Sequence, residues 1–225
     1  MRINIAIDGP SAAGKSTIAK RLAERLNYVH LDTGAMYRCT ALMTLRAGLS
    51  FEDEEKISEL LKNTEIRMTP DGKIFLNGED VSEAIRTDEI SLAASSVSKL
   101  LKIREDLVLR QQEMAKEKGF IMDGRDIGTV VLKDAEVKVF MTASPEARAE
   151  RRYRQNIEKG IPTSDVETIA AEIRERDYQD THREHSPLKK ADDAVEIDTS
   201  YMSIDEVTDA IYELAAPFLA KEDEQ

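Results

Sequence analysis

The chain has 225 residues, 41% of them hydrophobic, which is enough for one α/β domain with an insertion or for two small domains. Its formal net charge of −12 argues against general attraction to nucleic acid or to an anionic membrane surface. The single cysteine, Cys39, excludes an intrachain disulfide, and no apolar run approaches membrane-spanning length. With no signal peptide ahead of a core-like strand, these features indicate a cytoplasmic protein.

The first apolar segment, residues 3–8, predicts a buried strand, and a glycine-rich turn follows it. Residues 9–16 match G-x-x-x-x-G-K-[ST], and apolar residues at helical spacing follow from Ile18. Such a turn directs backbone amides at phosphate groups, while Lys15 supplies positive charge and the Ser16 hydroxyl is placed to hold Mg²⁺. The predicted ATP-binding residues are Gly9, Pro10, Ser11, Ala12, Ala13, Gly14, Lys15, Ser16 and Thr17.

Strands and helices alternate along most of the remaining sequence. Short apolar segments at 28–31, 120–123, 137–141 and 194–197 predict four further core strands. Stretches with helical periodicity separate most of them, and this alternation is typical of a parallel α/β sheet.

The periodicity changes between about residues 62 and 85. Residues 66–68 and 74–76 alternate between apolar and polar side chains, and Asn77-Gly78 is a turn signal. This pattern predicts a small antiparallel hairpin, or a three-stranded sheet with Val81 in the third strand. We interpret the segment as an insertion in the α/β core.

Capping signals predict where several helices begin. Ser144, followed by proline, is expected to cap one helix, and Ser164 and Ser203, each with a glutamate three residues later, cap two more. Thr33 is expected to cap the helix that follows it. The polar segment 156–164 predicts a mobile loop.

Charged residues could complete the phosphate site. Asp123 lies at the end of an apolar strand. Ligands of doubly wound sheets bind at the carboxyl ends of the strands, so Asp123 is a candidate to hold Mg²⁺. The alternative is that Asp123 is a loop aspartate that caps a turn.

Phosphoryl transfer needs positive charge around the migrating phosphoryl group, which makes the arginines candidates for binding it. The alternative is an exposed helix face, on which Arg148 would pair with Glu146 or Glu150. The arginines singled out are Arg38, Arg104, Arg125, Arg148, Arg151, Arg152, Arg154, Arg174, Arg176 and Arg183.

Five segments share their residues with one family. They are A-I-D-G-P through K-S-T at 6–17, L-D-T-G-A-M-Y-R at 31–38, I-R-T at 85–87, D-G-R-D-I-G-T at 123–129 and E-R-D at 175–177. Together they resemble bacterial cytidylate kinases over nearly the whole chain.

The resemblance implies the P-loop fold of the nucleoside monophosphate (NMP) kinases, an α/β fold with a five-stranded parallel sheet flanked by helices. The whole chain would be one kinase unit. Its core would comprise residues 1–34 and 86–225, and its NMP-binding region residues 35–85, with the antiparallel insertion at about 62–85. A short lid would lie at about 152–164.

The resemblance also implies the reaction ATP + CMP ⇌ ADP + CDP, with Mg²⁺, with dCMP also accepted and UMP disfavoured. Carried over by motif, Asp180 together with Thr33 would contact the sugar. The residues that would hold the CMP phosphate are Arg38, Arg125, Arg176 and Arg183. Those that would read the cytosine edge are Ser95, Arg104 and Asp126. Those expected to act in catalysis are Lys15, Arg125, Arg152 and Arg176. Thr33 stands where many relatives have serine and keeps the hydroxyl.

The base-reading prediction has a chemical rationale. A carboxylate such as Asp126 can accept a hydrogen bond from the amine of cytosine, whereas uracil would present a carbonyl and leave the carboxylate unpaired. We expect direct in-line transfer without a covalent intermediate, in a monomer whose partners are ATP and CMP or dCMP. Rival hypotheses are another small-molecule P-loop kinase (UMP, AMP or shikimate), a GTP-binding switch, for which the sequence lacks an N-K-x-D segment, and a nucleotide-gated binding module.

Overall fold

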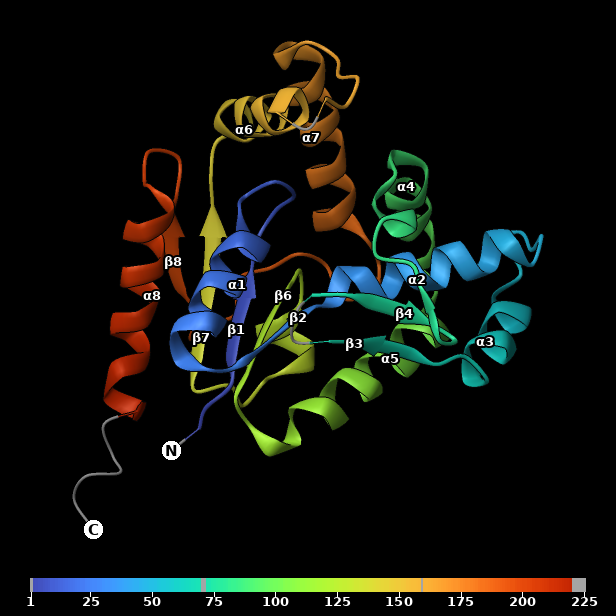
Figure 1. Ribbon diagram of the computed structural model, residues 1–225, viewed down its shortest axis with the longest axis horizontal. Helices are drawn as coiled ribbons and strands as arrows, with labels where there is room; N and C mark the ends of the chain where they lie inside the picture. Colours follow the sequence, from blue (N-terminus) through green and yellow to red (C-terminus); the bar gives the residue numbers. More distant parts are fainter. Residues whose placement is uncertain (1, 70–71, 159, 220–225) are drawn as a thin grey trace. The chain divides into compact units, whose positions relative to one another are not determined.

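The computed structural model describes residues 2–69, 72–158 and 160–219 (Figure 1). The chain divides into two compact units. The first unit comprises Met1–Tyr28 and Lys118–Gln225, and the second comprises Val29–Glu117. The predicted boundaries of the NMP-binding region, at 35 and 85, remain a prediction.

The first unit contains most of the α/β core. Its elements are β1 (Ile5–Asp8), α1 (Lys15–Leu26), β6 (Phe120–Gly124), a π-helix (Ile127–Val131), β7 (Val137–Thr142), α6 (Pro145–Glu158), α7 (Val166–His182), β8 (Val195–Asp198) and α8 (Ile204–Leu219). The main sheet has five strands in the order β2-β6-β1-β7-β8, where β2 is Val29–Asp32. β1 pairs in parallel with β6 and with β7, and β7 pairs in parallel with β8. The predicted five-stranded α/β fold is therefore confirmed.

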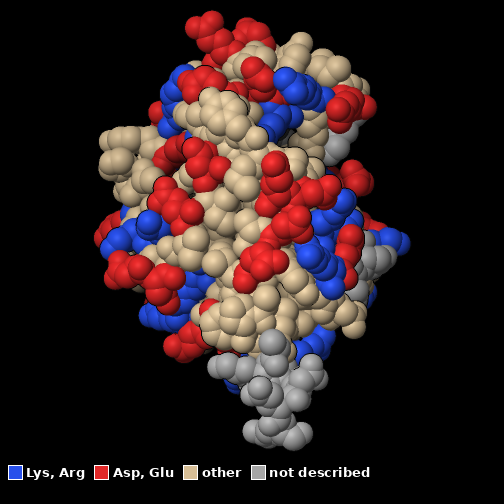
Figure 2. All heavy atoms as spheres, turned by 90° about the vertical axis from the view of Figure 1, so that its left-hand side faces the viewer, with Lys and Arg blue, Asp and Glu red and all other residues tan. Residues whose placement is uncertain are grey.

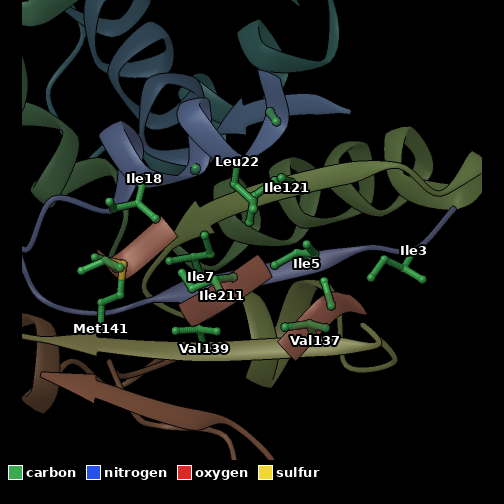
Figure 3. Close-up of a cluster of buried hydrophobic side chains, with 14 of the residues drawn as sticks. Ile3, Ile5, Ile7, Ile18, Leu22, Ile121, Val137, Val139, Met141 and Ile211 are labelled. Atoms are coloured by element: carbon green, nitrogen blue, oxygen red, sulfur yellow. The ribbon is translucent and has the colours of Figure 1, made fainter. Parts of the chain in front are cut away.

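The hydrophobic core of the first unit lies around β1. All four residues of β1 are buried, as expected for a central parallel strand that is covered on both faces. Helices α1 and α8 supply Ile18, Leu22 and Ile211 to this core (Figure 3). They pack with Ile3, which precedes β1, and with the strand residues Ile5, Ile7, Ile121, Val137, Val139 and Met141. This packing fixes the end of β1 and the start of α1, so the turn between them has anchored ends.

The second unit carries the predicted insertion. Its elements are β2, α2 (Thr33–Arg46), α3 (Glu54–Lys62), β3 (Ile66–Met68), β4 (Ile74–Leu76), β5 (Glu79–Asp80), a 3-10 turn (Ala84–Arg86), α4 (Asp88–Val97), α5 (Leu101–Met114) and a second 3-10 turn (Ala115–Glu117). β3, β4 and β5 form an antiparallel sheet, which confirms the predicted three-stranded form. The third strand is Glu79–Asp80, and buried Val81 follows it with its N–H bonded to the carbonyl of Ile74 at 2.9 Å.

Two of the predicted caps are wrong by one residue. Asp165, not Ser164, caps α7, because its carboxylate accepts the N–H of Thr168 at 2.8 Å. A carboxylate also interacts favourably with the positive end of the helix dipole. Likewise Asp32 caps α2, and Thr33 is the first residue of that helix.

The caps predicted at Ser144 and Ser203 are confirmed by bonds from the N–H groups of Ala147 and Glu206. The predicted loop at 156–164 begins later than expected, since α6 continues to Glu158.

On the face drawn in Figure 2, acidic and basic side chains are interspersed. Among the described residues, no helix has the length and apolar character needed to cross a membrane.

Candidate active site

The turn between β1 and α1 packs closely against β7. A Cβ atom added to Gly9 would lie 2.1 Å from the carbonyl oxygen of Met141, so only glycine fits at this position. Gly14, just before α1, has a φ of +91°, a left-handed conformation that glycine adopts without strain. The two glycines therefore serve different purposes: Gly9 allows close approach to β7, and Gly14 allows the chain to enter the helix.

Lys15 begins α1 and is held against the turn. Its side chain is buried, and Nζ donates a hydrogen bond to the carbonyl oxygen of Pro10 at 2.7 Å. Burial, with a smaller contribution from the charge of Arg125, lowers the pKa of Lys15 to about 7, while Asp123 opposes the shift. The ammonium group thus lacks full compensation in the protein alone, and a phosphate anion would supply it.

Ser16 and Asp123, the two predicted metal ligands, lie next to each other. The Ser16 Oγ donates to Oδ2 of Asp123 at 2.7 Å, and the Asp123 carboxylate is buried in β6. Among the described residues, no group of three or more His, Cys, Asp or Glu side chains could hold a metal ion alone. A neighbouring hydroxyl and carboxylate could supply two oxygen ligands to a cation whose remaining ligands are phosphate oxygens and water.

Asp8 was not predicted as a site residue. Its Oδ1 and Oδ2 accept the backbone N–H groups of Ile127 and Gly128 at 2.8 and 2.7 Å. Burial raises the pKa of the Asp8 carboxyl to about 6, although these two donors act in the opposite direction. Asp8 thus links the end of β1 to the chain that follows β6, where Asp126 lies. Asp8 is part of the D-G-P segment, but no local pattern in the sequence indicates hydrogen-bond partners as distant as Ile127 and Gly128.

Five predicted CMP-binding residues belong to the first unit, in or near β6 and α7. Arg125 Nε bonds to Asp180 Oδ2 at 2.8 Å, and both side chains are largely buried. Burial is the largest single influence and alone would lower the pKa of Arg125 and raise that of Asp180. The partner's charge, the hydrogen bond between the two side chains and neighbouring charges together outweigh burial, so the pKa of Arg125 is raised, that of Asp180 is lowered, and the pair stays ionised. Arg183 Nη2 lies 3.7 Å from Asp126 Oδ1. Arg176 lies one helical turn before Asp180 in α7.

Four predicted CMP-binding residues belong to the second unit: Thr33, Arg38, Ser95 and Arg104. Arg38 Nη2 bonds to Asp32 Oδ2 at 2.6 Å, while its buried Nε has no hydrogen-bond partner within the part of the chain that the structure describes. Arg104 is buried, donates to the carbonyl of Ser98 at 3.0 Å and lies 5.5 Å from the centre of the Tyr37 ring.

A pocket of about 470 Å³ adjoins the glycine-rich turn. It is lined by Gly14 and Thr17 from the turn and α1, by Arg152 from α6, and by Thr199 and Ser203 from the segment between β8 and α8. Arg154 also lines it and pairs with Glu150. The predicted catalytic residue Arg152 thus lies beside the turn that carries Lys15.

The remaining candidate arginines of α6 and α7 are engaged by the protein. Arg148 is buried and pairs with Asp177, so the alternative of an exposed helix face on which it pairs with Glu146 or Glu150 is wrong. Arg151 donates to the backbone carbonyls of Thr199 and Ser200. Arg174 pairs with Glu146 on the surface.

The strand, turn and helix around Lys15, with the adjoining Ser16–Asp123 pair, define a P-loop protein that binds nucleotide phosphates. Among solved structures, a shikimate kinase from Bacteroides thetaiotaomicron has a TM-score of 0.51 and covers 96% of this chain and 99% of that chain. At 13% identity this similarity concerns the fold.

The family model for cytidylate kinase matches residues 5–216. Cytidylate kinase of Bacillus subtilis (strain 168) is 54% identical over 215 residues, which cover 94% of this chain and 96% of that protein. Cytidylate kinase of Geobacillus sp. (strain WCH70) is 52% identical over the same shares. The chain belongs to the cytidylate kinase family.

Proposed function

We propose that this protein is a phosphotransferase that transfers the γ-phosphate of ATP to CMP. The observation that carries this proposal is the family match, which spans both compact units. The turn at 9–16, with Lys15 buried beneath it, supports ATP as the donor. The likeness to a shikimate kinase concerns the fold alone, so it gives no support to a shikimate acceptor.

The donor nucleotide would use three features of the first unit. The glycine-rich turn and Lys15 would hold the β- and γ-phosphates, and the adjoining pocket of about 470 Å³ would hold the base and sugar. Ser16 and Asp123 would hold Mg²⁺, since a hydroxyl and a carboxylate are oxygen ligands of the kind this ion prefers. When bound, Mg²⁺ neutralises charge on the phosphates.

The acceptor nucleotide would use the residues carried over from the family motifs. Asp126 with Ser95 and Arg104 would read the cytosine edge, and Asp180 with Thr33 would contact the sugar. The residues proposed for the CMP phosphate are Arg38, Arg125, Arg176 and Arg183. The unpartnered Nε of Arg38 and the ionised state of Arg125 both favour binding of an anion.

Catalysis would be electrostatic. The phosphate oxygen of CMP that attacks is ionised near neutral pH, so the reaction needs no strong general base. Lys15, Arg125, Arg152 and Arg176 would stabilise the charge on the migrating phosphoryl group. Residues at about 152–164 would act as a lid that excludes water. We further propose that the protein acts as a cytoplasmic monomer without nucleic-acid or membrane partners.

ADP formation, measured in parallel with CMP, dCMP, UMP and AMP, tests the proposal. We expect rapid turnover with CMP and dCMP and little with UMP or AMP. Comparable turnover with UMP or AMP would favour the alternative of another small-molecule kinase, and ATP binding without any turnover would indicate a binding module.

A further inference from the structure

A buried ion pair connects α6, α7 and the glycine-rich turn. Arg148 in α6 is 3% exposed, and its Nη1 and Nη2 atoms donate to the two carboxylate oxygens of Asp177 in α7 at 3.0 and 2.5 Å. The same Nη1 donates to the carbonyl oxygen of Ser11 at 2.9 Å, and Nε donates to that of Ala143 at 2.9 Å. One guanidinium group therefore holds the turn, the end of β7 and α7 together.

Helices α6 and α7 lie side by side (Figure 1). Interactions other than the Arg148–Asp177 pair also hold them together. Ala149 of α6 packs in a buried cluster with Ile169, Ala170 and Ile173 of α7. An exposed ion pair between Glu146 and Arg174 joins the same helices. Because these contacts already join α6 to α7, the distinctive feature of Arg148 is its bond to the turn.

Packing supports the same link. Ala12, in the middle of the turn, packs against the α6–α7 cluster and has a φ of +58°, a left-handed conformation that is uncommon for alanine. The turn is therefore shaped to contact α6 and α7 at two successive residues, through the side chain of Ala12 and the carbonyl of Ser11.

The position of α7 matters because Asp177 lies between two residues proposed to bind CMP. Arg176 directly precedes it, and Asp180, which bonds to Arg125 at 2.8 Å, follows within one turn. A shift of α7 relative to the turn would move these groups relative to the donor phosphates. A misplacement of about 1 Å between reacting groups can lower a rate by about a hundredfold.

We propose that Arg148 and Asp177 are positioning residues for phosphoryl transfer, and that the Arg148 guanidinium keeps the glycine-rich turn and α7 in register. The proposal rests on the proposed function, because it assigns ATP to the turn and CMP to groups on α7. Neither residue needs to contact a nucleotide.

The test compares Asp177→Asn with Glu146→Gln. Both replace a carboxylate with an amide of the same shape in the same pair of helices, but the arginine partner of Glu146 has no bond to the turn in this structure. For each protein, calorimetry gives the Kd of ATP alone and of CMP alone, and rapid quench gives the single-turnover transfer rate with both substrates saturating. We expect Asp177→Asn to lower the transfer rate by about 30- to 100-fold with both Kd values within about threefold of wild type. Glu146→Gln should leave the rate within about twofold.

Two outcomes would overturn the proposal: a folded Asp177→Asn variant that transfers at the wild-type rate, or a loss that weaker substrate binding explains entirely. If Asp177→Asn does not fold, because it leaves a buried arginine unpaired, the double variant Arg148→Met/Asp177→Met removes both charges. The same loss of rate is expected from the double variant, and a wild-type rate in it would also overturn the proposal. Failure of the proposed function shows separately, in wild-type protein that forms no ADP in response to CMP.

Discussion

Replacing Lys15 with methionine should stabilise the unliganded protein while it removes activity. Burial and, to a smaller extent, the charge of Arg125 lower the pKa of Lys15 from 10.5 to about 7. Each pKa unit corresponds to about 1.4 kcal/mol, so the charged lysine destabilises the fold by roughly 4–5 kcal/mol near neutral pH. Methionine keeps the apolar stem but leaves the Pro10 carbonyl without its donor, which offsets about 1–3 kcal/mol.

The expected net gain is about 1–4 kcal/mol, which corresponds to a rise in Tm of about 2–16 °C for a chain of this size. Its pH dependence follows from the direction of the shift. A lysine whose pKa is lowered in the fold makes its full contribution to stability above the unfolded pKa of 10.5, and this contribution is lost as the pH falls toward 7. The advantage of methionine should therefore be greatest near or below pH 7 and shrink toward pH 10.

Circular dichroism melts without nucleotide, at several pH values, measure this effect, and ADP formation measures activity, which should fall by at least about a hundredfold. Lys20→Met is the matched control, because Lys20 lies in the same helix and is exposed; its stability should change by less than about 0.5 kcal/mol. A Lys15→Met variant less stable than wild type near pH 7, or an advantage that grows with pH, would refute the electrostatic reasoning.

Three other predictions concern substrate choice, the metal and the turn. Asp126→Asn should reduce the ratio of kcat/KM between CMP and UMP by at least about tenfold, and an unchanged ratio would remove Asp126 from base recognition. Chelation of divalent cations should abolish ADP formation, and added Mg²⁺ should restore it. Ser16→Ala should raise the Mg²⁺ concentration needed for the half-maximal rate by about tenfold, and an unchanged Mg²⁺ requirement in this variant would exclude Ser16 as a ligand. Gly9→Ala should weaken ATP binding by at least about tenfold in a titration, because its Cβ would lie 2.1 Å from the Met141 carbonyl oxygen, and normal affinity would show that the turn can move away from β7.

Features set by local sequence were predictable. The turn at 9–16 follows a fixed spacing, and the five core strands and the insertion follow from periodicity, as the structure confirms. The predicted helix caps, Ser164 and Thr33, each lie one residue from the observed cap. A neighbouring aspartate offers a better hydrogen-bond acceptor in each case, which moves the start of the helix by one residue. The π-helix at Ile127–Val131 has no sequence periodicity that would indicate it.

Features that depend on distant partners were not predictable. Arg148 looked like a residue of an exposed helix face, but its partner Asp177 lies in the next helix, and its bond to Ser11 depends on how α6 packs against the turn. The role of Asp8 likewise requires β1 and β6 to be side by side. Which residues bind CMP stays a prediction, because their roles depend on a ligand and not on contacts within the protein.

The central place of β1 has a consequence for how the protein forms during synthesis. Ile5 pairs with Ile121 on one side and with Val137 on the other, so both neighbours of the first strand are made more than a hundred residues after it. At about 5–20 residues per second, the apolar strand and its phosphate-binding turn wait on the order of ten seconds for their partners. The nascent chain therefore exposes its most buried strand for most of its synthesis, and we expect this interval, not the final stability, to determine how readily the protein aggregates during production.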